Sequence, residues 1–227
     1  MSTNDGKIGF RIGDDFVRPE PMLVERIGSF STPPLSDSLN KFYTMNADIK
    51  PILDSIKIAG SALTVRLRPG DNLMLHKAIG EVKTGDVIVV DTGNCRTNCV
   101  MGELIAMAAF QAGAAGIVID GGIRDILELR ENKYPIFARY IIPSVGDKDG
   151  PGEINLTISC GGVVVNPGDI IVGDANGVVV VPVELAENVI VDAEKKIEYE
   201  QRRRNEIISG ILVKADINET LKNKGVI

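Results

Sequence analysis

The chain has 227 residues, 44% hydrophobic and 25% charged, a balance typical of a globular domain that buries a core without disulfide or metal staples. A net charge of −6 at pH 7 argues against a general nucleic-acid-binding protein, because such proteins need a basic face. We find no apolar stretch near the roughly 18 residues of a membrane span and no apolar signal segment, so we expect a cytoplasmic protein that does not bind membranes.

The first part of the chain, to about residue 50, is predicted to be helical with intervening loops. A short helix is expected over residues 19–27, and the segment 31–34 (STPP) is expected to end it. Ser36 or Asp37 is then expected to cap a second helix.

The next segments alternate between strand and helix patterns. Alternating β-branched residues predict a strand over 58–67, and a helix is expected over 72–79 after a turn. A strand–helix–strand unit follows, with its strands at 86–91 and 116–120 and its helix at 102–112. The connection between the two strands is long enough for them to run parallel.

The last third is predicted to contain a short helix ending at Leu129, a strand within 134–142 and a glycine-rich loop over 144–152. Turn dipeptides indicate a β-meander over 161–182, and a long helix is expected over about 184–209. Together these elements predict an α/β fold, with a mixed central β-sheet flanked by helices and a long C-terminal helix, in a single domain spanning residues 1–227.

Two loops, 92–101 and 121–125, follow parallel strands and should lie side by side, where ligands bind in open α/β sheets. The first loop opens a helix whose free N–H groups, beginning near Glu103, favour a carboxylate or phosphate. The second presents Arg124, which matches a carboxylate bidentately, and Asp125, a hard oxygen ligand. This combination predicts an anion site beside a divalent-cation site.

Each of these residues also has a purely structural interpretation. Asp125 and Glu103 are both placed to complement a helix dipole in a first turn, and Arg124 is free to form a structural ion pair. From the residues alone both interpretations stay open.

Two blocks of sequence resemble a known family. Residues 102–106 (GELIA) and 113–125 (GAAGIVIDGGIRD), followed by Glu128, form the first, and residues 167–182 (PGDIIVGDANGVVVVP) form the second. Both closely resemble the signatures of the 4-hydroxy-4-methyl-2-oxoglutarate aldolases, whose fold is shared with the regulator of ribonuclease activity A (the RraA-like family). The resemblance extends over roughly residues 31–210.

This resemblance implies a class II, divalent-metal-dependent pyruvate aldolase of the 4-hydroxy-4-methyl-2-oxoglutarate or 4-carboxy-4-hydroxy-2-oxoadipate type. Oxaloacetate decarboxylation is expected as a side activity, because both reactions form a pyruvate enolate. In this family the arginine matched by Arg124 grips the pyruvyl group of a small 2-oxo acid. Backbone N–H groups matched by Leu104 and Ile105, after Gly102, hold its carboxylate.

The resemblance also implies a metal and a partner subunit. Asp125 matches the aspartate that binds Mg²⁺ or Mn²⁺, and the other ligands of the metal are largely waters. Glu103 matches an acid that contacts metal-bound water. Family enzymes are homotrimers or homohexamers (dimers of trimers) in which a neighbouring subunit contributes a C-terminal glutamate. Glu200 is the best match, with Glu198 as the alternative.

Several other residues are assigned less closely. Arg96 and Arg139 are candidates to receive a second carboxylate of the substrate, and Asp91 and Asp120 end their strands near the site. His76 is expected to be structural or exposed rather than catalytic.

The three cysteines, Cys95, Cys99 and Cys160, are an odd number that fits reduced, passive thiols. With a single histidine in the chain, we do not expect a zinc site.

The alternative function is a non-catalytic regulator that binds a ribonuclease. The presence of Arg124, Asp125, Glu103 and a C-terminal glutamate favours the enzyme, because a binding module does not need the full set. The basic cluster at residues 202–204 lies among glutamates and is interpreted as a solvated helix face, with an RNA contact as the minority interpretation.

Overall fold

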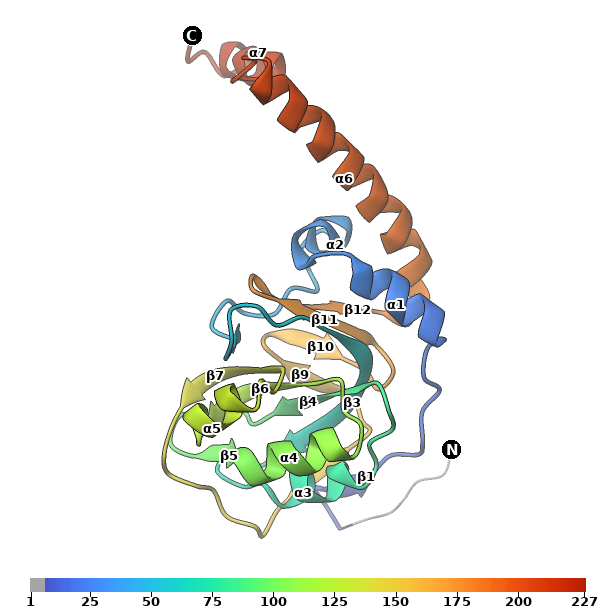
Figure 1. The fold of residues 1–227 in the computed structure, drawn as a ribbon, viewed down its shortest axis with the longest axis vertical. Helices are drawn as coiled ribbons and strands as arrows, with labels where there is room; N and C mark the ends of the chain where they lie inside the picture. The colour runs from blue at the N-terminus through green and yellow to red at the C-terminus, as the bar shows by residue number, and fades with distance from the viewer. Residues whose placement is uncertain (1–6) are drawn as a thin grey trace.

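The computed structural model describes residues 7–227, so the predicted N-terminal helical segment begins partly outside the described residues. Within the described chain, no helix is long and apolar enough to cross a membrane. The elements are β1 Phe10–Ile12, α1 Pro21–Ser29, α2 Thr32–Ser38, β2 Lys50–Pro51, β3 Ile58–Leu67, α3 Leu73–Ile79, β4 Asp86–Asp91, β5 Cys99–Met101, α4 Glu103–Gln111, β6 Gly116–Ile123, α5 Ile126–Glu131, β7 Ile136–Ile141, β8 Gly152–Ile154, β9 Ile158–Cys160, β10 Val163–Val165, β11 Ile170–Asp174, β12 Gly177–Val181, a 3-10 turn Val183–Leu185, α6 Ala186–Ile208 and α7 Ala215–Asn223 (Figure 1).

Ten of the described strands form one mixed sheet in the order β1-β8-β3-β4-β6-β7-β2, with β11 and β12 branching from β3 and β5 pairing with β6. Strands β3, β4, β6 and β7 run parallel, because helical crossovers connect them. Their apolar, β-branched residues are buried, as expected for strands covered on both faces. Asp91, the last residue of β4, pairs with Asp120, which lies three residues before the end of β6, so the strand is longer than predicted.

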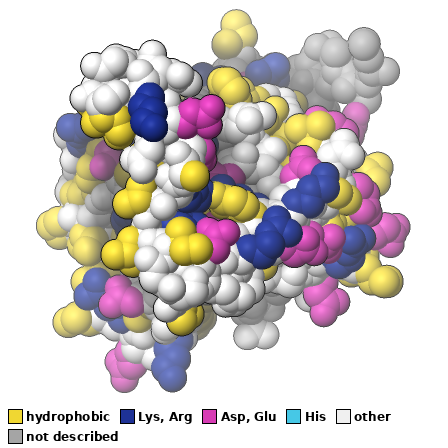
Figure 2. All heavy atoms as spheres, turned by 90° about the horizontal axis from the view of Figure 1, so that it is seen from above, with side chains coloured by type: hydrophobic (Ala, Val, Ile, Leu, Met, Phe, Trp, Pro, Cys, Tyr) yellow, Lys and Arg dark blue, Asp and Glu magenta, His cyan; other side chains and the backbone are white. Residues whose placement is uncertain are grey.

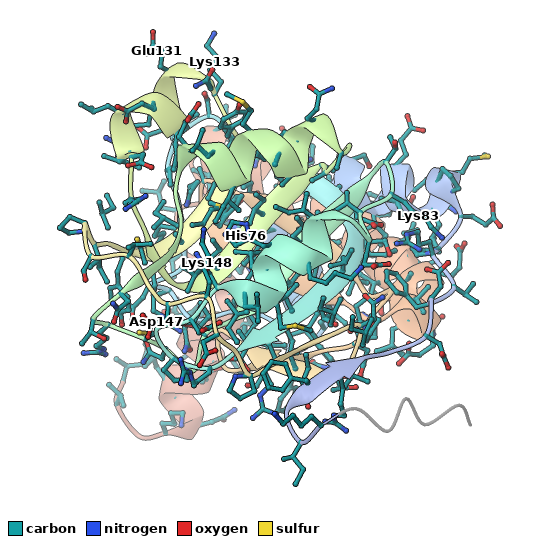
Figure 3. All side chains as sticks on the ribbon, turned by 90° about the horizontal axis from the view of Figure 1, so that it is seen from below. His76, Lys83, Glu131, Lys133, Asp147 and Lys148 are labelled. Carbon is teal, nitrogen blue, oxygen red and sulfur yellow. The ribbon has the colours of Figure 1, made fainter. Side chains whose placement is uncertain are left out.

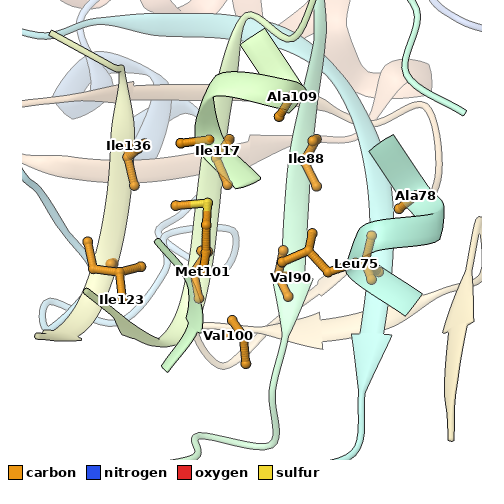
Figure 4. Close-up of a cluster of buried hydrophobic side chains, with 14 of the residues drawn as sticks. Leu75, Ala78, Ile88, Val90, Val100, Met101, Ala109, Ile117, Ile123 and Ile136 are labelled. Carbon is orange, nitrogen blue, oxygen red and sulfur yellow. The ribbon is translucent and has the colours of Figure 1, made fainter. Parts of the chain in front are cut away.

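Helices and a second β layer cover the two faces of this sheet. Helices α3, α4 and α5 pack on one face over aliphatic side chains such as Ile88, Val90 and Ile117 (Figure 4). On the other face the β9–β10 hairpin and the β11–β12 hairpin enclose a second core, and α1, α2 and α6 cover β11 and β12 (Figure 1). The predicted α/β fold, with a mixed sheet between helices and a long C-terminal helix, is confirmed.

The structure corrects one helix and the meander. Thr32, Pro33 and Pro34 were expected only to break a helix, but they form the first turn of α2. Proline is tolerated there because first-turn N–H groups have no intrahelical partner. The expected meander is instead two separate hairpins, since β10 pairs with β9 and β11 pairs with β12 and β3.

The C-terminal helix leaves the body of the molecule. Only its first half packs on the body of the molecule, through Ala186, Val189, Ile190 and Ala193, and the rest extends outward with α7 at its far end (Figure 1). The face seen in Figure 2 carries basic and acidic side chains beside one another, with hydrophobic side chains between them.

Candidate active site

Arg124 and Asp125 follow β6 directly, at the carboxyl edge of the parallel strands. The short strand β5 pairs with the end of β6, and the Arg124 N–H donates to the Met101 carbonyl at 3.0 Å. This pairing places the start of α4 beside the Arg-Asp pair. The two loops that the sequence predicted to be neighbours are therefore in contact.

The carboxylate of Asp125 points towards α4 rather than to its own helix. Asp125 occupies the N-cap position of α5 in a left-handed conformation, with φ 56°, and its side chain makes no capping hydrogen bond. Instead its Oδ2 accepts the Glu103 N–H at 3.1 Å and lies 3.5 Å from the Arg124 Nε. Aspartate is one of the few non-glycine residues that adopt this region readily.

Gly102 is required by this close approach. A Cβ at Gly102 would lie 2.2 Å from the Asp125 Oδ2 and 3.1 Å from both the Cγ and the Nε of Arg124. Any larger side chain would therefore displace both charged groups.

The N-terminus of α4 leaves two amides free. The Leu104 and Ile105 N–H groups make no hydrogen bond with the described residues, whereas the Ala106 N–H already donates to the Gly102 carbonyl. Such free amides at a helix start favour an anion. Glu103 contributes its backbone amide to Asp125, and its side chain is not among the cavity-lining residues.

These groups share one small cavity of about 140 Å³. At about 30 Å³ of liquid volume per water, this is room for roughly five waters, which suits a small acid rather than a large cofactor. The cavity is lined by Asn72, His76, Val100, Met101, Gly102, Leu104, Ile105, Arg124, Asp125, Val145 and Lys148.

His76 and Lys148 belong to this cavity, although no sequence pattern placed either of them there. His76 is exposed, as expected, but it also lines the cavity, because α3 packs beside α4. Desolvation, and then the positive charge of Lys148, lowers the pKa of His76 and so favours the neutral imidazole. Figure 3 shows the two residues near one another.

Other predicted residues lie outside the cavity. Arg139 is buried, forming ion pairs with Asp120 and with Asp48, so it is not free to receive a substrate carboxylate. Arg96 is exposed over the Tyr140 ring, 5.6 Å from its centroid, and does not line the cavity.

Asp91 ends its strand at the same sheet edge but is not a lining residue. Burial raises the pKa of its carboxyl. Cys95, Cys99 and Cys160 are buried free thiols.

Glu200 and Glu198 lie on the projecting half of α6 and are not among the lining residues. Within one chain, neither glutamate reaches the Arg124 site.

A larger open hollow of about 560 Å³ lies at another surface. Its arginines Arg11 and Arg66 already form ion pairs with the buried Glu153. It contains no counterpart of the Arg-Asp pair beside free helix amides, so the smaller cavity is the better candidate.

Comparison with known proteins agrees with the fold. The RraA-like family model, described as Aldolase/RraA, matches residues 32–180. The chain belongs to the RraA-like family. The matched region contains every residue that lines the cavity.

Relatives of this RraA-like protein include both aldolases and regulators. It is 40% identical over 193 residues to a Halalkalibacterium halodurans protein named "Putative 4-hydroxy-4-methyl-2-oxoglutarate aldolase", covering 83% of this chain and 91% of that one. It is 32% identical over 126 residues to the 4-hydroxy-4-methyl-2-oxoglutarate aldolase of Thermus thermophilus, covering 56% of this chain and 76% of that one. The structure of Streptomyces coelicolor RraAS2, described as an unusual member of the RNase ES inhibitor RraA protein family, superimposes with a TM-score of 0.76 and 28% identity. It covers 84% of this chain and 99% of that one.

Proposed function

We propose that this protein is a divalent-metal-dependent lyase that releases pyruvate from 4-hydroxy-2-oxo acids and also decarboxylates oxaloacetate. The observation that supports this most directly is the meeting of Arg124, Asp125 and the two free amides of α4 in one small cavity. The relatives named as aldolases support the same reaction class.

The side chains present suit an enolate-forming reaction. The Leu104 and Ile105 amides hold the carboxylate of the pyruvyl group, and the guanidinium of Arg124 binds its 2-oxo oxygen. In the aldol cleavage the 4-hydroxyl gives its proton to a water molecule, the C3–C4 bond breaks, and its electron pair moves to the 2-oxo oxygen. The enolate then takes a proton from water at C3 and is released as pyruvate. In oxaloacetate the C3–C4 bond breaks with loss of CO₂ and gives the same enolate. Arg124 stabilises the negative charge where it develops.

The residues fit a hydrated Mg²⁺ or Mn²⁺ ion and do not fit a closed metal cage. Asp125 is one carboxylate, and within residues 7–227 no group of three or more His, Cys, Asp or Glu side chains is arranged to hold a metal. Mg²⁺ keeps several waters and is bound through as few as one carboxylate. Asp125 would hold the ion, and its Oδ1 makes no hydrogen bond with a described residue. When bound, the cation supplies Lewis-acid stabilisation of the enolate.

A neighbouring subunit is proposed to complete the site in a homotrimer or a dimer of trimers. The half of α6 that carries Glu200 projects from the body of the molecule, where its Arg203 and Tyr199 contact the segment that leads to α7, and Leu104 at the cavity is 75% exposed. Both features suit a helix from another copy lying near the cavity.

The shared-enolate mechanism is tested by Arg124→Ala. Pyruvate release from oxaloacetate and from 4-hydroxy-4-methyl-2-oxoglutarate should both fall by about a hundredfold or more, because both reactions need the same charge stabilisation. Arg96→Ala removes an exposed arginine outside the cavity and should leave both rates unchanged. Loss of only one activity in Arg124→Ala would rule out a shared enolate.

The second candidate is a regulator that binds a ribonuclease, and it is favoured by the similarity to the ribonuclease-inhibitor family of RraAS2. A complete absence of pyruvate release with any divalent metal would favour that function. Capture of a ribonuclease by the purified protein would then be the next measurement.

A further inference from the structure

The N-terminal arm, residues 7–20, runs along the edge of the main sheet before α1 begins (Figure 1). It lies outside residues 32–180, the region that the family model matches. The proposed reaction does not use it. The arm is nevertheless fastened to the body of the molecule at several points, and one of these contacts reaches the loop that forms a wall of the cavity.

The first fastening point is a buried ion pair at the amino end of β4. The guanidinium of Arg18 donates from Nε and Nη2 to the two carboxylate oxygens of Asp86, at 2.7 and 2.8 Å. The Asp86 side chain is 1% exposed. A second arm residue, Phe16, lies against Arg18, with its ring centroid 4.2 Å from the guanidinium carbon. This bidentate pair fixes the end of the arm that is remote from the cavity.

The middle of the arm is the edge strand β1, which pairs in parallel with β8. The Gly152 N–H donates to the Gly9 carbonyl at 2.7 Å. Across the same strand pair, the Arg11 Nε donates to the buried carboxylate of Glu153 at 2.6 Å. Because β8 has only three residues, its position depends on its neighbours, β1 on one side and β3 on the other.

Phe10 of β1 contacts the cavity loop, which we define as residues 142–151 between β7 and β8. Its ring lies against Gly150, since a Cβ at Gly150 would be 2.3 Å from the Phe10 Cε1. The same segment is bound by the buried carboxylate of Asp71, which accepts the Asp149 N–H and the Gly150 N–H, each at 2.8 Å. The arm and a carboxylate near the start of α3 therefore hold one short stretch of the cavity loop.

The cavity loop forms one wall of the cavity, through Val145 and Lys148. Lys148 comes directly before the stretch that Phe10 and Asp71 hold. Gly150 has a φ of 76°, and a glycine without further contacts leaves such a conformation easily. Without the ring of Phe10, the loop would sample more conformations. A ligand in contact with this wall would then have to order it, which lowers the affinity.

We propose that the N-terminal arm positions this wall of the cavity, with Phe10 as a positioning residue that acts through Gly150. The effect on the reaction rests on the proposed function, whereas the effect on the cavity loop does not. Arg124 and Asp125 come from the end of β6, and Asp125 is held by the start of α4. Loss of the Phe10 ring should therefore weaken substrate binding and leave the chemical step almost unchanged.

Amide hydrogen exchange of the full chain tests the positioning without requiring turnover. Phe10→Ala should accelerate exchange of the Asp149 and Gly150 amides at least about tenfold, because the loop then opens without global unfolding. Phe10→Leu should restore most of the protection. Phe16→Ala is the matched control, since it removes another aromatic ring of the arm, one that packs on Arg18. It should leave both amides within about twofold of the wild type.

The kinetics of oxaloacetate decarboxylation test the consequence for the cavity. In Phe10→Ala the KM should rise about fivefold, the ordering cost of roughly one side chain, while kcat stays within about twofold. The assignment is overturned if Phe10→Ala leaves the two amides protected, if it accelerates their exchange without raising KM, or if Phe16→Ala has the same effects. Absence of pyruvate release by the wild type would refute the lyase function, and the exchange rates alone would then decide whether the arm holds the loop.

Discussion

Gly102 shows how strictly one residue limits the geometry of the cavity. Its φ is −134°, a value open to any residue, so the need for glycine is steric and does not come from the backbone conformation. The space that a Cβ would occupy is filled by the charged ends of Arg124 and Asp125. The sequence motif therefore has a physical reason at this position.

Gly102→Ala should lower the activity of the protein without lowering its stability by much. Arg124 and Asp125 are 42% and 38% exposed, so they can move aside without disturbing the core. A displacement of about 1 Å at reacting groups costs on the order of a hundredfold in rate. We expect pyruvate release to fall by about that factor, while the thermal unfolding midpoint changes by only a few degrees.

Gly80→Ala provides the comparison for this variant. Gly80 ends α3 in a right-handed helical conformation, and the nearest atom to its new Cβ would be the Lys77 carbonyl oxygen at an ordinary 3.4 Å. Activity close to wild type in Gly102→Ala would mean that the Arg124–Asp125 arrangement is not needed for the reaction.

At the scale of elements, the sequence predicted best where the apolar pattern was long. The bounds of β3 and β4 agree with the predicted ranges, because β4 is a run of β-branched residues and β3 is a long, largely buried strand. The three-residue strands β1, β5 and β8 were not predicted, since strands so short are defined by their pairing partners and have no periodicity of their own. Helix α7 was also missed.

The candidate site was likewise predicted only where a general sequence pattern applied. The contact between Arg124 and the start of α4 followed from a rule about parallel strands, and the structure brings those segments together. The contribution of α3 and the Lys148 loop did not follow from any local pattern. It depends on the hydrogen bonds of Asp71, which join segments far apart in the chain.

At the scale of the whole molecule, the projecting C-terminal region carries apolar residues that a single chain leaves exposed. Beyond Ala193, the C-terminal region exposes Ile208, Leu212 and Val226, among other apolar residues. Exposed apolar surface of this kind marks interaction sites. The proposed neighbouring subunit would cover it and would bring Glu200 to a second Arg124 site.

Mixed assemblies test whether Glu200 acts across subunits. Arg124→Ala and Glu200→Ala chains should each be inactive alone, and co-refolded assemblies should regain activity at about a quarter of their sites, the statistical share in which both residues are intact. Arg124→Ala co-refolded with wild-type chains provides the reference for assembly. If the two variants never complement each other, Glu200 serves its own subunit or has no part in the site.

Metal-dependent pyruvate release tests the central claim most directly. Pyruvate formed from oxaloacetate and from 4-hydroxy-4-methyl-2-oxoglutarate would be measured with Mg²⁺ and with EDTA, for the wild type and for Asp125→Ala. The account predicts release from both acids that EDTA abolishes, that added Mg²⁺ restores, and that Asp125→Ala lacks under every condition. Release that persists in EDTA, or in Asp125→Ala, would contradict a metal-dependent lyase site at Asp125.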